Sequence, residues 1–226
     1  MSKQTIKRFS VYFIGMVLLA FGLVLNTKTG LGASPLVAIA FCLSELTALP
    51  FANVTFLMYC LFVLIEIMLH LMRRQRAAAD ARLLQLPFSL VFTRFMSLFD
   101  ACLPTFAVDC AGTFWGLVWV RVALLLAAIV LIGLGASLSV NMRLIPNPGD
   151  GCVLSIADFT GKGIGAVKIA FDIANVAVAC GIGLIARGRL LGVGIGTVLA
   201  MLGVGRVMGA ITRRLSLHFA TLAPDK

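Results

Sequence analysis

Three polar residues within one apolar stretch have the types and spacing of a binding site. Lys168, Asp172 and Asn175 stand at i, i+4 and i+7, which places all three on one stripe of a helix. Charges at bilayer depth cost at least about 2.5 to 3.5 kcal/mol each, so they are expected to face the protein interior and to be paired. In a binding site, Asp172 would take up a proton or cation and Lys168 would meet an anionic group. Alternatively, the two form an intrahelical pair near a helix end, with Lys168 reaching toward water.

A second candidate site is marked by proline at the predicted start of two short apolar segments. Asn147-Pro148-Gly149-Asp150-Gly151 begins one segment, and Ala33-Ser34-Pro35 precedes the other. Ser or Asn followed by Pro is typical of a helix start, where free N–H groups attract anions. Alternatively, Asn147 is only a helix cap and Asp150 only complements the helix dipole. The predicted substrate-binding residues are Ser34, Pro35, Asn147, Pro148, Gly149, Asp150, Lys168 and Asn175.

Four carboxylates are candidates for ion coupling, namely Asp172, Glu45, Asp158 and Glu66. Glu45 and Asp158 stand at matched places late in the two short segments and are equally well interpreted as polar helix ends turned toward water. Glu66 lies inside an apolar stretch, and an arginine from another such stretch is its expected partner, because pairing is the least costly arrangement for both charges. The arginines inside such stretches are Arg94, Arg121 and Arg206.

The sequence lacks the residue sets of metal, haem or nucleotide chemistry. Its six cysteines include no C-x-x-C pair and its two histidines, His70 and His218, are far apart, so no metal or cofactor is expected. It has no nucleophile-and-base motif and no phosphate-binding loop, so an enzyme is not expected. Cys102 and Cys110 flank a short loop and form either a disulfide or two free thiols.

The elements that must position these residues are membrane-spanning helices. Of 226 residues, 61% are apolar and only 12% are charged, and the mean hydropathy is +1.06, which excludes an ordinary soluble domain. Six stretches approach the roughly twenty residues that cross about 30 Å of hydrocarbon. They cover residues 9–25, 52–72, 83–103, 114–140, 166–186 and 190–210. Two further segments, 36–47 and 149–160, would reach only about 18 Å as helices and are too short to cross.

The surplus of ten positive charges indicates an orientation in the bilayer. With six spans and a cytoplasmic N-terminus, twelve basic residues lie inside, and three, Lys28, Arg187 and Arg189, lie outside. If both short segments also crossed, the count would be seven inside against eight outside, so the bias survives only with six spans. The first span is interpreted as a helix rather than a cleaved signal peptide, because its apolar core is long. We therefore expect a bacterial inner-membrane protein with both termini cytoplasmic and no nucleic-acid partner.

An internal repeat relates the two halves of the chain. Adding 113 to a residue number carries Pro35 onto Pro148 and Thr47 onto Thr160, and after a six-residue insertion Arg82 matches Arg189. The repeats cover residues 10–103, with half-helix 36–47, and 114–214, with half-helix 149–160; the cytoplasmic N-terminus (1–9), an external loop (104–113) and a cytoplasmic tail (215–226) complete the chain. Three crossings is an odd number, so the second copy enters the bilayer from the opposite side, which predicts an inverted-topology repeat. In such folds, re-entrant helices meet near the midplane and bind ligand there.

The repeated unit resembles a known family of bacterial membrane proteins. One copy reads Asn26-x-x-x-Gly30-x-Gly-x-Ser34-Pro35 and later Leu49-Pro50-Phe51, and the other reads Asn147-Pro148-Gly149-Asp150-Gly151 and later Thr160-Gly161-Lys-Gly-Ile-Gly165. Over nearly the whole chain this is similar to the YczE/YyaS/YitT family, closest to its YczE-like branch, with departures from the glycine-rich pattern at Ala48 and Ala52. The resemblance implies a polytopic inner-membrane protein, described either as a transporter or as an accessory factor that affects secreted metabolites.

A ladder of small residues lies in the last span. Gly192, Gly196 and Ala200 follow one another at intervals of four, which permits close helix packing and only weakly indicates a dinucleotide loop. A homodimer through this face is therefore a partner that the sequence allows.

Together these features predict an all-α polytopic membrane protein with six transmembrane helices, two re-entrant half-helices and two inverted repeats. Its predicted function is that of a secondary transporter or facilitator of a small polar or anionic solute, with alternating access around a midplane site. The lipid bilayer and this unidentified solute are its expected partners. Two alternatives stay open: a membrane accessory protein that modulates a partner enzyme or exporter through the basic loop 73–82, and a substrate-binding subunit of a larger transport complex.

Overall fold

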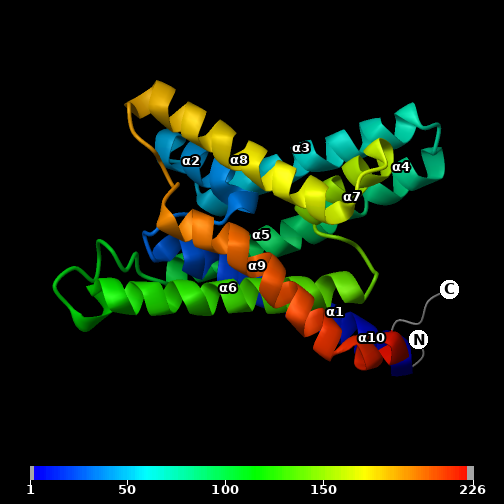
Figure 1. Ribbon diagram of the computed structural model, residues 1–226, viewed down its shortest axis with the longest axis horizontal. Coiled ribbons are helices and arrows are strands. Elements are labelled where there is room, and N and C mark those ends of the chain that lie inside the picture. Colours follow the sequence, from blue (N-terminus) through cyan, green and yellow to red (C-terminus); the bar gives the residue numbers. More distant parts are fainter. Residues whose placement is uncertain (1–2, 223–226) are drawn as a thin grey trace. The chain divides into compact units, whose positions relative to one another are not determined.

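The computed structural model describes residues 3–222, and these fold into helices with no strand among them (Figure 1). The prediction of an all-helical fold is confirmed. Residues 1–2 and 223–226, at the ends of the two predicted cytoplasmic termini, lie outside the described residues. The helices are α1 (Lys3–Lys28), η1 (Pro35–Val37), α2 (Ala38–Thr47), α3 (Phe51–Met72), α4 (Arg76–Arg82), α5 (Gln85–Cys102), η2 (Phe114–Gly116), α6 (Val118–Asn141), α7 (Pro148–Thr160), α8 (Ile164–Arg187), α9 (Ile195–Arg214) and α10 (Ser216–Leu222).

Five helices in the described part of the chain are long and apolar enough to cross a membrane. They are α3, α6, α8, α9 and the Gln4–Lys28 part of α1, and each covers one predicted span. The multi-pass membrane character of the chain is thus confirmed. The remaining predicted span, 83–103, lies mostly on α5, which has 18 residues and is not among the five. Gln85, Arg94 and Asp100 lower the mean hydropathy of this helix.

The two segments predicted to be too short to cross form α2, with 10 residues, and α7, with 13. Both end on a residue in the left-handed conformation, Ala48 with φ 56° and Gly161 with φ 71°. Glycine adopts this conformation freely, whereas a residue with a Cβ resists it by about 1–2 kcal/mol. Ala48 and Gly161 are 113 residues apart, which is the offset of the predicted repeat, and both short helices end in the same conformation.

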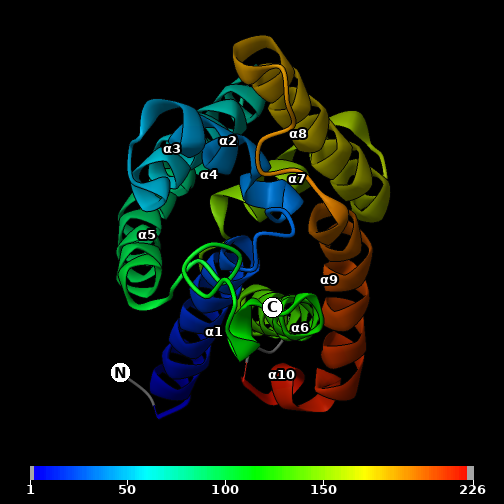
Figure 2. The same ribbon diagram turned by 90° about the vertical axis from the view of Figure 1, so that its left-hand side faces the viewer.

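The chain divides into two compact units, each described by itself. The first combines residues 1–34, 98–144 and 194–226. In it, α1 packs along α6 and α6 packs along α9 (Figure 2). Glycines let α1 and α6 approach closely: a Cβ on Gly135 would lie 2.6 Å from the carbonyl oxygen of Gly15.

The hydrogen bonds of two arginines show in which directions α1 and α6 run. Near the start of α1, Arg8 Nε donates to the carbonyl oxygen of Met142, just after α6 ends, at 2.6 Å. Near the start of α6, Arg121 Nε donates to the carbonyl oxygen of Thr29, just after α1 ends, at 2.7 Å. The two helices are therefore antiparallel, and each arginine satisfies a carbonyl group at a helix end.

The second unit combines residues 35–97 and 145–193. Here α7 packs against α3 and α8, and α2 packs against α8 and α3. Each short helix thus contacts both the long helix that follows it in the chain and the long helix that follows the other short helix. Helix α4 packs on α3. This unit contains all but one of the predicted site residues, since only Ser34 belongs to the first unit.

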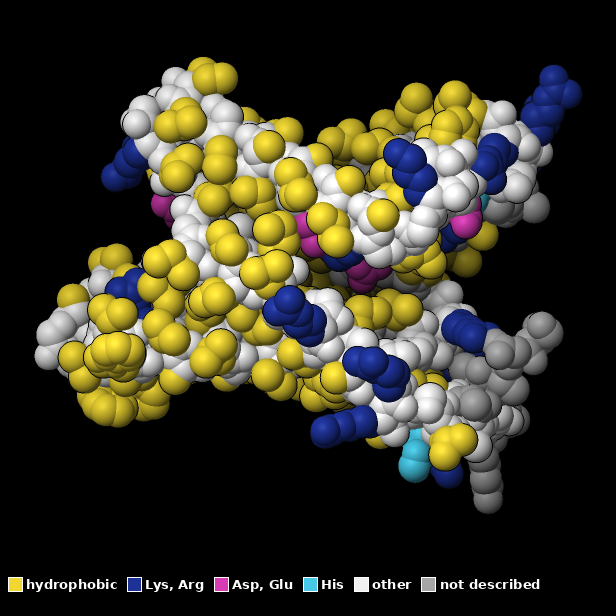
Figure 3. Space-filling view, viewed as in Figure 1, with side chains coloured by type: hydrophobic (Ala, Val, Ile, Leu, Met, Phe, Trp, Pro, Cys, Tyr) yellow, Lys and Arg dark blue, Asp and Glu magenta, His cyan; other side chains and the backbone are white. Residues whose placement is uncertain are grey.

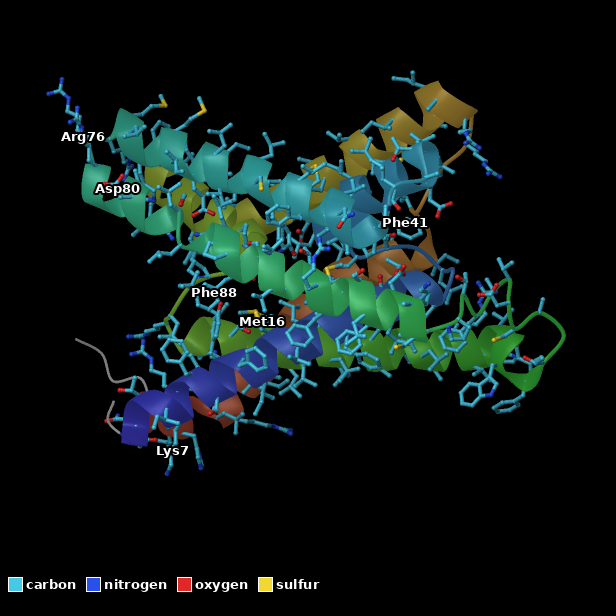
Figure 4. All side chains as sticks on the ribbon, turned by 180° about the vertical axis from the view of Figure 1, so that it is seen from behind. Lys7, Met16, Phe41, Arg76, Asp80 and Phe88 are labelled. Atoms are coloured by element: carbon cyan, nitrogen blue, oxygen red, sulfur yellow. The ribbon has the colours of Figure 1, made fainter. Side chains whose placement is uncertain are left out.

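The surface is rich in apolar side chains (Figure 3). Leu57 and Met68 on α3 and Ile185 on α8 are exposed, the last by 91%. Such exposure is expected where hydrocarbon rather than water surrounds the helices. At the turn between α3 and α4 the surface is basic instead, and the side chain of Arg76 extends away from the ribbon in Figure 4.

Candidate functional site

The predicted stripe on α8 is present, and its two charges are paired. Lys168 Nζ donates to Asp172 Oδ1 at 2.8 Å, and the side chains are 34% and 10% exposed. One turn further along, the buried Asn175 donates from Nδ2 to the carbonyl oxygen of Phe171 at 2.9 Å. The pair has the geometry of the predicted intrahelical alternative. It also leaves Lys168, which is partly exposed, able to meet an additional anionic group.

The start of α7 lies against α3. Asn147 Oδ1 accepts from the backbone N–H of Gly149 at 3.1 Å, and Asn147 Nδ2 donates to the Tyr59 hydroxyl at 3.3 Å. Pro148 occupies the first helical position, as the sequence predicts. The cap therefore satisfies one of the free N–H groups that an anion would otherwise use. Tyr59, which is fully buried, was not predicted as a site residue.

Asp150, in the first turn of α7, brings a negative charge to this region. It interacts electrostatically with Tyr59 on α3 and with Asp172 on α8. The predicted residues Asn147, Asp150 and Asp172 therefore do lie in one neighbourhood. A carboxylate at the start of a helix complements the helix dipole, so Asp150 competes with any anionic ligand for the same field.

The starts of the two short helices meet. Gly149 has no room for a side chain because Leu36 of η1 occupies the space next to its Cα atom. Pro35 and Pro148, immediately before these residues, are both buried. Ser34, 4% exposed, is the last residue of the other unit and stands next to this contact only through its peptide bond to Pro35.

Two predicted ion-coupling carboxylates lie apart from this neighbourhood. Glu45, near the end of α2, and Asp158, near the end of α7, are both exposed. Their exposure agrees with the alternative interpretation of polar helix ends. The structure does not bring either of them to Asp172.

Glu66 on α3 is fully buried and is surrounded by polar groups from three other segments. Its Oε2 accepts from Gln85 Nε2 at 3.0 Å, and it lies 3.4 Å from Ser155 Oγ and 3.4 Å from Arg82 Nε. A side chain on Gly151 is excluded, because its Cβ would lie 2.6 Å from Glu66 Oε1. This arrangement forms a built polar cluster inside an apolar helix bundle.

The arginine that pairs with Glu66 is therefore Arg82, and the expectation that it is Arg94, Arg121 or Arg206 was wrong. Arg94 Nη2 donates to Asn53 Oδ1 at 2.7 Å, and Arg121 lies in the other unit. Arg206 is exposed. His70, which contacts both Arg82 and Ser155, was also missed. Its position four residues after Glu66, on the same helical face, is the signal that would have identified it.

The remaining predictions concern cysteines and small residues. Cys102 and Cys110 are both free thiols, which is the second of the two alternatives. Of the small-residue ladder, Gly196 approaches Leu31, Ala200 packs in a cluster with Leu125 and Ile129, and Gly192 packs against Phe41. These residues are used within the chain, so a homodimer through the same face would have to displace those contacts.

Comparison with known proteins gives a family and no named relative. Residues 6–213 match the family described as "Family of unknown function (DUF6198)". No curated protein and no solved structure matches the chain. The match does not bear on the resemblance to the YczE/YyaS/YitT family, which stays a prediction.

Proposed function

The chain belongs to the family of unknown function DUF6198, and from the geometry of its second unit we propose that it is a secondary transporter or facilitator of a small polar or anionic solute. In this proposal α5 is the sixth span, α2 and α7 are re-entrant, and the two repeats are inverted. One observation carries the proposal. A lysine–aspartate pair, an asparagine and a tyrosine hydroxyl gather where a helix too short to cross begins between two long apolar helices.

Symmetric contacts support the repeat. The Sγ atom of Cys42 on α2 donates to the carbonyl oxygen of Ala179 on α8 at 3.5 Å. Adding 113 to the first number and subtracting it from the second gives Ser155 and Glu66, whose side chains lie 3.4 Å apart. Equivalent residues therefore make equivalent contacts between the copies, as a twofold relation requires.

Two further features support the same relation. Leu36 and Gly149 are equivalent positions and touch each other, which places them where the twofold axis would pass. In the first unit, the equivalent helices α1 and α6 pack antiparallel. An antiparallel pair of equivalent helices is the arrangement expected when the second copy enters the bilayer from the other side.

The pairing of Lys168 with Asp172 suggests how solute and ion would be coupled. An anionic solute group would compete with Asp172 for the Lys168 ammonium. Asp172 would then be left as a buried carboxylate without its cationic partner, which makes uptake of a proton or cation favourable. Solute binding and ion binding would thus favour each other, and rocking of one repeat against the other would expose the site alternately.

The positive-inside bias supports an orientation with both termini in the cytoplasm of a bacterium. On this orientation, the basic turn between α3 and α4 is cytoplasmic, and the loop between α5 and α6, which carries Asp109 and no basic residue, is external.

Proteoliposomes containing a pH-sensitive dye test the proposal. Phosphate, sulfate, short-chain carboxylates and amino acids are added outside in turn, and solute uptake and proton uptake are both measured. We expect one class to be taken up together with protons, and we expect Asp172→Asn to abolish the proton movement. Asp158→Asn, which changes an exposed carboxylate, is the matched control and should behave as the wild type. Undiminished coupled transport in Asp172→Asn would remove the coupling role of this residue.

The two non-transporting alternatives make a different prediction. If the chain modulates a partner protein, charge reversal in the basic loop 73–82 should abolish its cellular effect, while Asp172→Asn and Asn147→Ala should not. If it is the binding subunit of a larger complex, a nucleotide-binding protein should co-purify with it.

A further inference from the structure

Two acceptor oxygens in the polar cluster around Glu66 have no hydrogen-bond donor in the described part of the chain. Glu66 and Gln85 are 0% and 1% exposed, and the Oε1 atom of each has no hydrogen-bond partner in the described part of the chain. A buried carboxylate oxygen without a donor is costly. A protonated carboxyl group differs, because it supplies a hydrogen and carries no charge. The two unfilled acceptors therefore favour a proton as the missing component of the cluster.

A continuous series of polar atoms leads from Glu66 to an exposed residue. Glu66 Oε2 lies 3.4 Å from Ser155 Oγ, and Ser155 Oγ lies 3.3 Å from His70 Nε2. On the other side of the imidazole ring, His70 Nδ1 lies 3.0 Å from Oε1 of Gln75, which is exposed in the turn between α3 and α4. Hydroxyl and imidazole groups both accept a proton at one atom and donate one from another, or from the same oxygen.

Arginine sets the tautomer of the histidine in this series. Arg82 Nε donates toward His70 Nε2 at 3.3 Å, so Nε2 is the acceptor and the ring hydrogen is on Nδ1. The hydrogen on Nδ1 then donates to Gln75 Oε1. The Nε2 lone pair of His70 thus lies between two donors, Arg82 Nε and the Ser155 hydroxyl.

The titratable and charged groups that face Glu66 come from three elements. They are His70 on α3, Arg82 at the end of α4 and Cys152 on α7. Helix α5 contributes the neutral Gln85. Arg82 is the one permanent charge among these groups, and it stabilises the carboxylate that remains once Glu66 has lost a proton.

We propose that Glu66 is a proton-binding site that exchanges with water at the α3–α4 turn through Ser155 and His70. In release, Glu66 carries its proton on Oε2, the oxygen that faces Ser155, and this O–H bond breaks as the proton passes to Ser155 Oγ. The hydroxyl proton of Ser155 passes to His70 Nε2. The Nδ1 proton of His70 passes to water beside Gln75. One proton leaves Glu66, one reaches water, and His70 is left as its other neutral tautomer; uptake is the reverse.

Only one copy of the predicted repeat contains this series of polar residues, so the site connects to one side of the membrane. The residue equivalent to Glu66 is Ala179, and the residue equivalent to His70 is Gly183, so the other copy has no such series. The proton-binding site does not depend on the proposed transport function. Only the side of the membrane to which the site opens is taken from the proposed orientation. On the proposed orientation, Glu66 exchanges protons with the cytoplasm alone.

Infrared difference spectroscopy on the full-length protein in lipid nanodiscs tests the site without any solute. After a step in pH, we expect the wild type to show a protonated-carboxyl C=O band that shifts in D2O. Glu66→Gln, which keeps the side-chain shape, should lack this band, and Glu45→Gln, which changes an exposed carboxylate, should keep it. His70→Gln should keep the band but slow its appearance at least about tenfold, and added imidazole should restore the rate.

Several results would overturn the proposal. A band retained in Glu66→Gln would assign the proton to another carboxyl group, and no band in the wild type would mean that Glu66 does not titrate. An unchanged rate in His70→Gln would remove the relay. If Glu66→Gln does not fold, as judged by circular dichroism and size-exclusion chromatography, Ser155→Ala decides: it keeps the carboxyl group, and we expect the band to appear as slowly as in His70→Gln. These spectra succeed or fail independently of solute transport.

Discussion

The two short helices of the second unit rest on long helices that the predicted repeat makes equivalent, in opposite chemical surroundings. Helix α7 packs on α3 beside Glu66, Ser155 and Gly151. Helix α2 packs on α8 in an apolar cluster that includes Cys42 and Ala179. The same backbone arrangement therefore accommodates a charged side chain in one copy and a methyl group in the other.

This difference shows which residues the packing of a short helix on a long helix requires. Because the apolar copy forms without any charge, the contact between a short and a long helix does not need Glu66. Buried ion pairs are seldom a net source of stability compared with well-packed apolar groups. A buried glutamate and histidine beside the partly exposed Arg82, at one of two positions that the predicted repeat relates, are therefore better explained by the proposed proton site than by folding.

The largest loss of stability is expected when a carboxylate is introduced into the apolar copy without the polar partners that surround Glu66. Ala179→Glu places a carboxylate in the apolar cluster of Ala38, Cys42 and Leu191, so we expect the free energy of unfolding to fall by about 3–5 kcal/mol. Ala179→Gln is the matched control, with the same size and no charge. Reversible unfolding in mixed micelles measures both. Equal losses in the two variants would mean that volume, not charge, distinguishes the copies.

A smaller effect is expected from crowding the polar copy. In Gly151→Ala, the new Cβ would lie 2.6 Å from Glu66 Oε1 and 3.0 Å from Gln85 Nε2, so the cluster must shift. We expect a loss of about 1–3 kcal/mol. Gly205→Ala is the control, because a Cβ there meets nothing within 4 Å and alanine is the better helix former. If both variants unfold alike, the cluster is looser than its distances indicate.

A third change exchanges the two equivalent side chains that touch the long helices. Ser155→Cys weakens the hydrogen bonds to Glu66 and His70, and we expect it to lower the free energy of unfolding by about 1 kcal/mol. Cys42→Ser is expected to cost less, because its hydroxyl can still donate to the carbonyl oxygen of Ala179. The same unfolding experiment ranks the two. A larger loss in Cys42→Ser would show that the apolar copy depends more strongly on its contact atom.

The smallest effect is expected at the ends of the short helices, where the two copies agree in conformation and differ in residue. Ala48→Gly relieves a left-handed alanine and should raise the free energy of unfolding by about 0.5–1 kcal/mol. Gly161→Ala should lower it by a comparable amount. A destabilising Ala48→Gly would mean that the alanine side chain makes a contact worth more than the strain.

Five of the six predicted spans match long apolar helices, because bilayer thickness sets the length of apolar stretches. The helix start at Pro148 was predictable because proline favours the first helical position, and the repeat stays a prediction. The pairing of Lys168 with Asp172 was equally accessible, since both residues lie on one helix. The partners of Glu66 were not. Arg82 is the last residue of the short helix α4, and its return to α3 depends on a turn in which Arg74 has φ 59°. The contact of Tyr59 with Asn147 likewise joins residues that no helical spacing relates.

The meeting of Leu36 with Gly149 says something about the history of the chain. In an assembly of two identical subunits, a position on the twofold axis faces a second copy of itself, so it must be filled by two leucines or by two glycines. Two leucines would collide where Leu36 now excludes even a Cβ, and two glycines would leave a void. A leucine can face a glycine at this position only if the two copies are encoded separately. On the proposed duplication, this contact would have arisen after the two halves had become free to diverge.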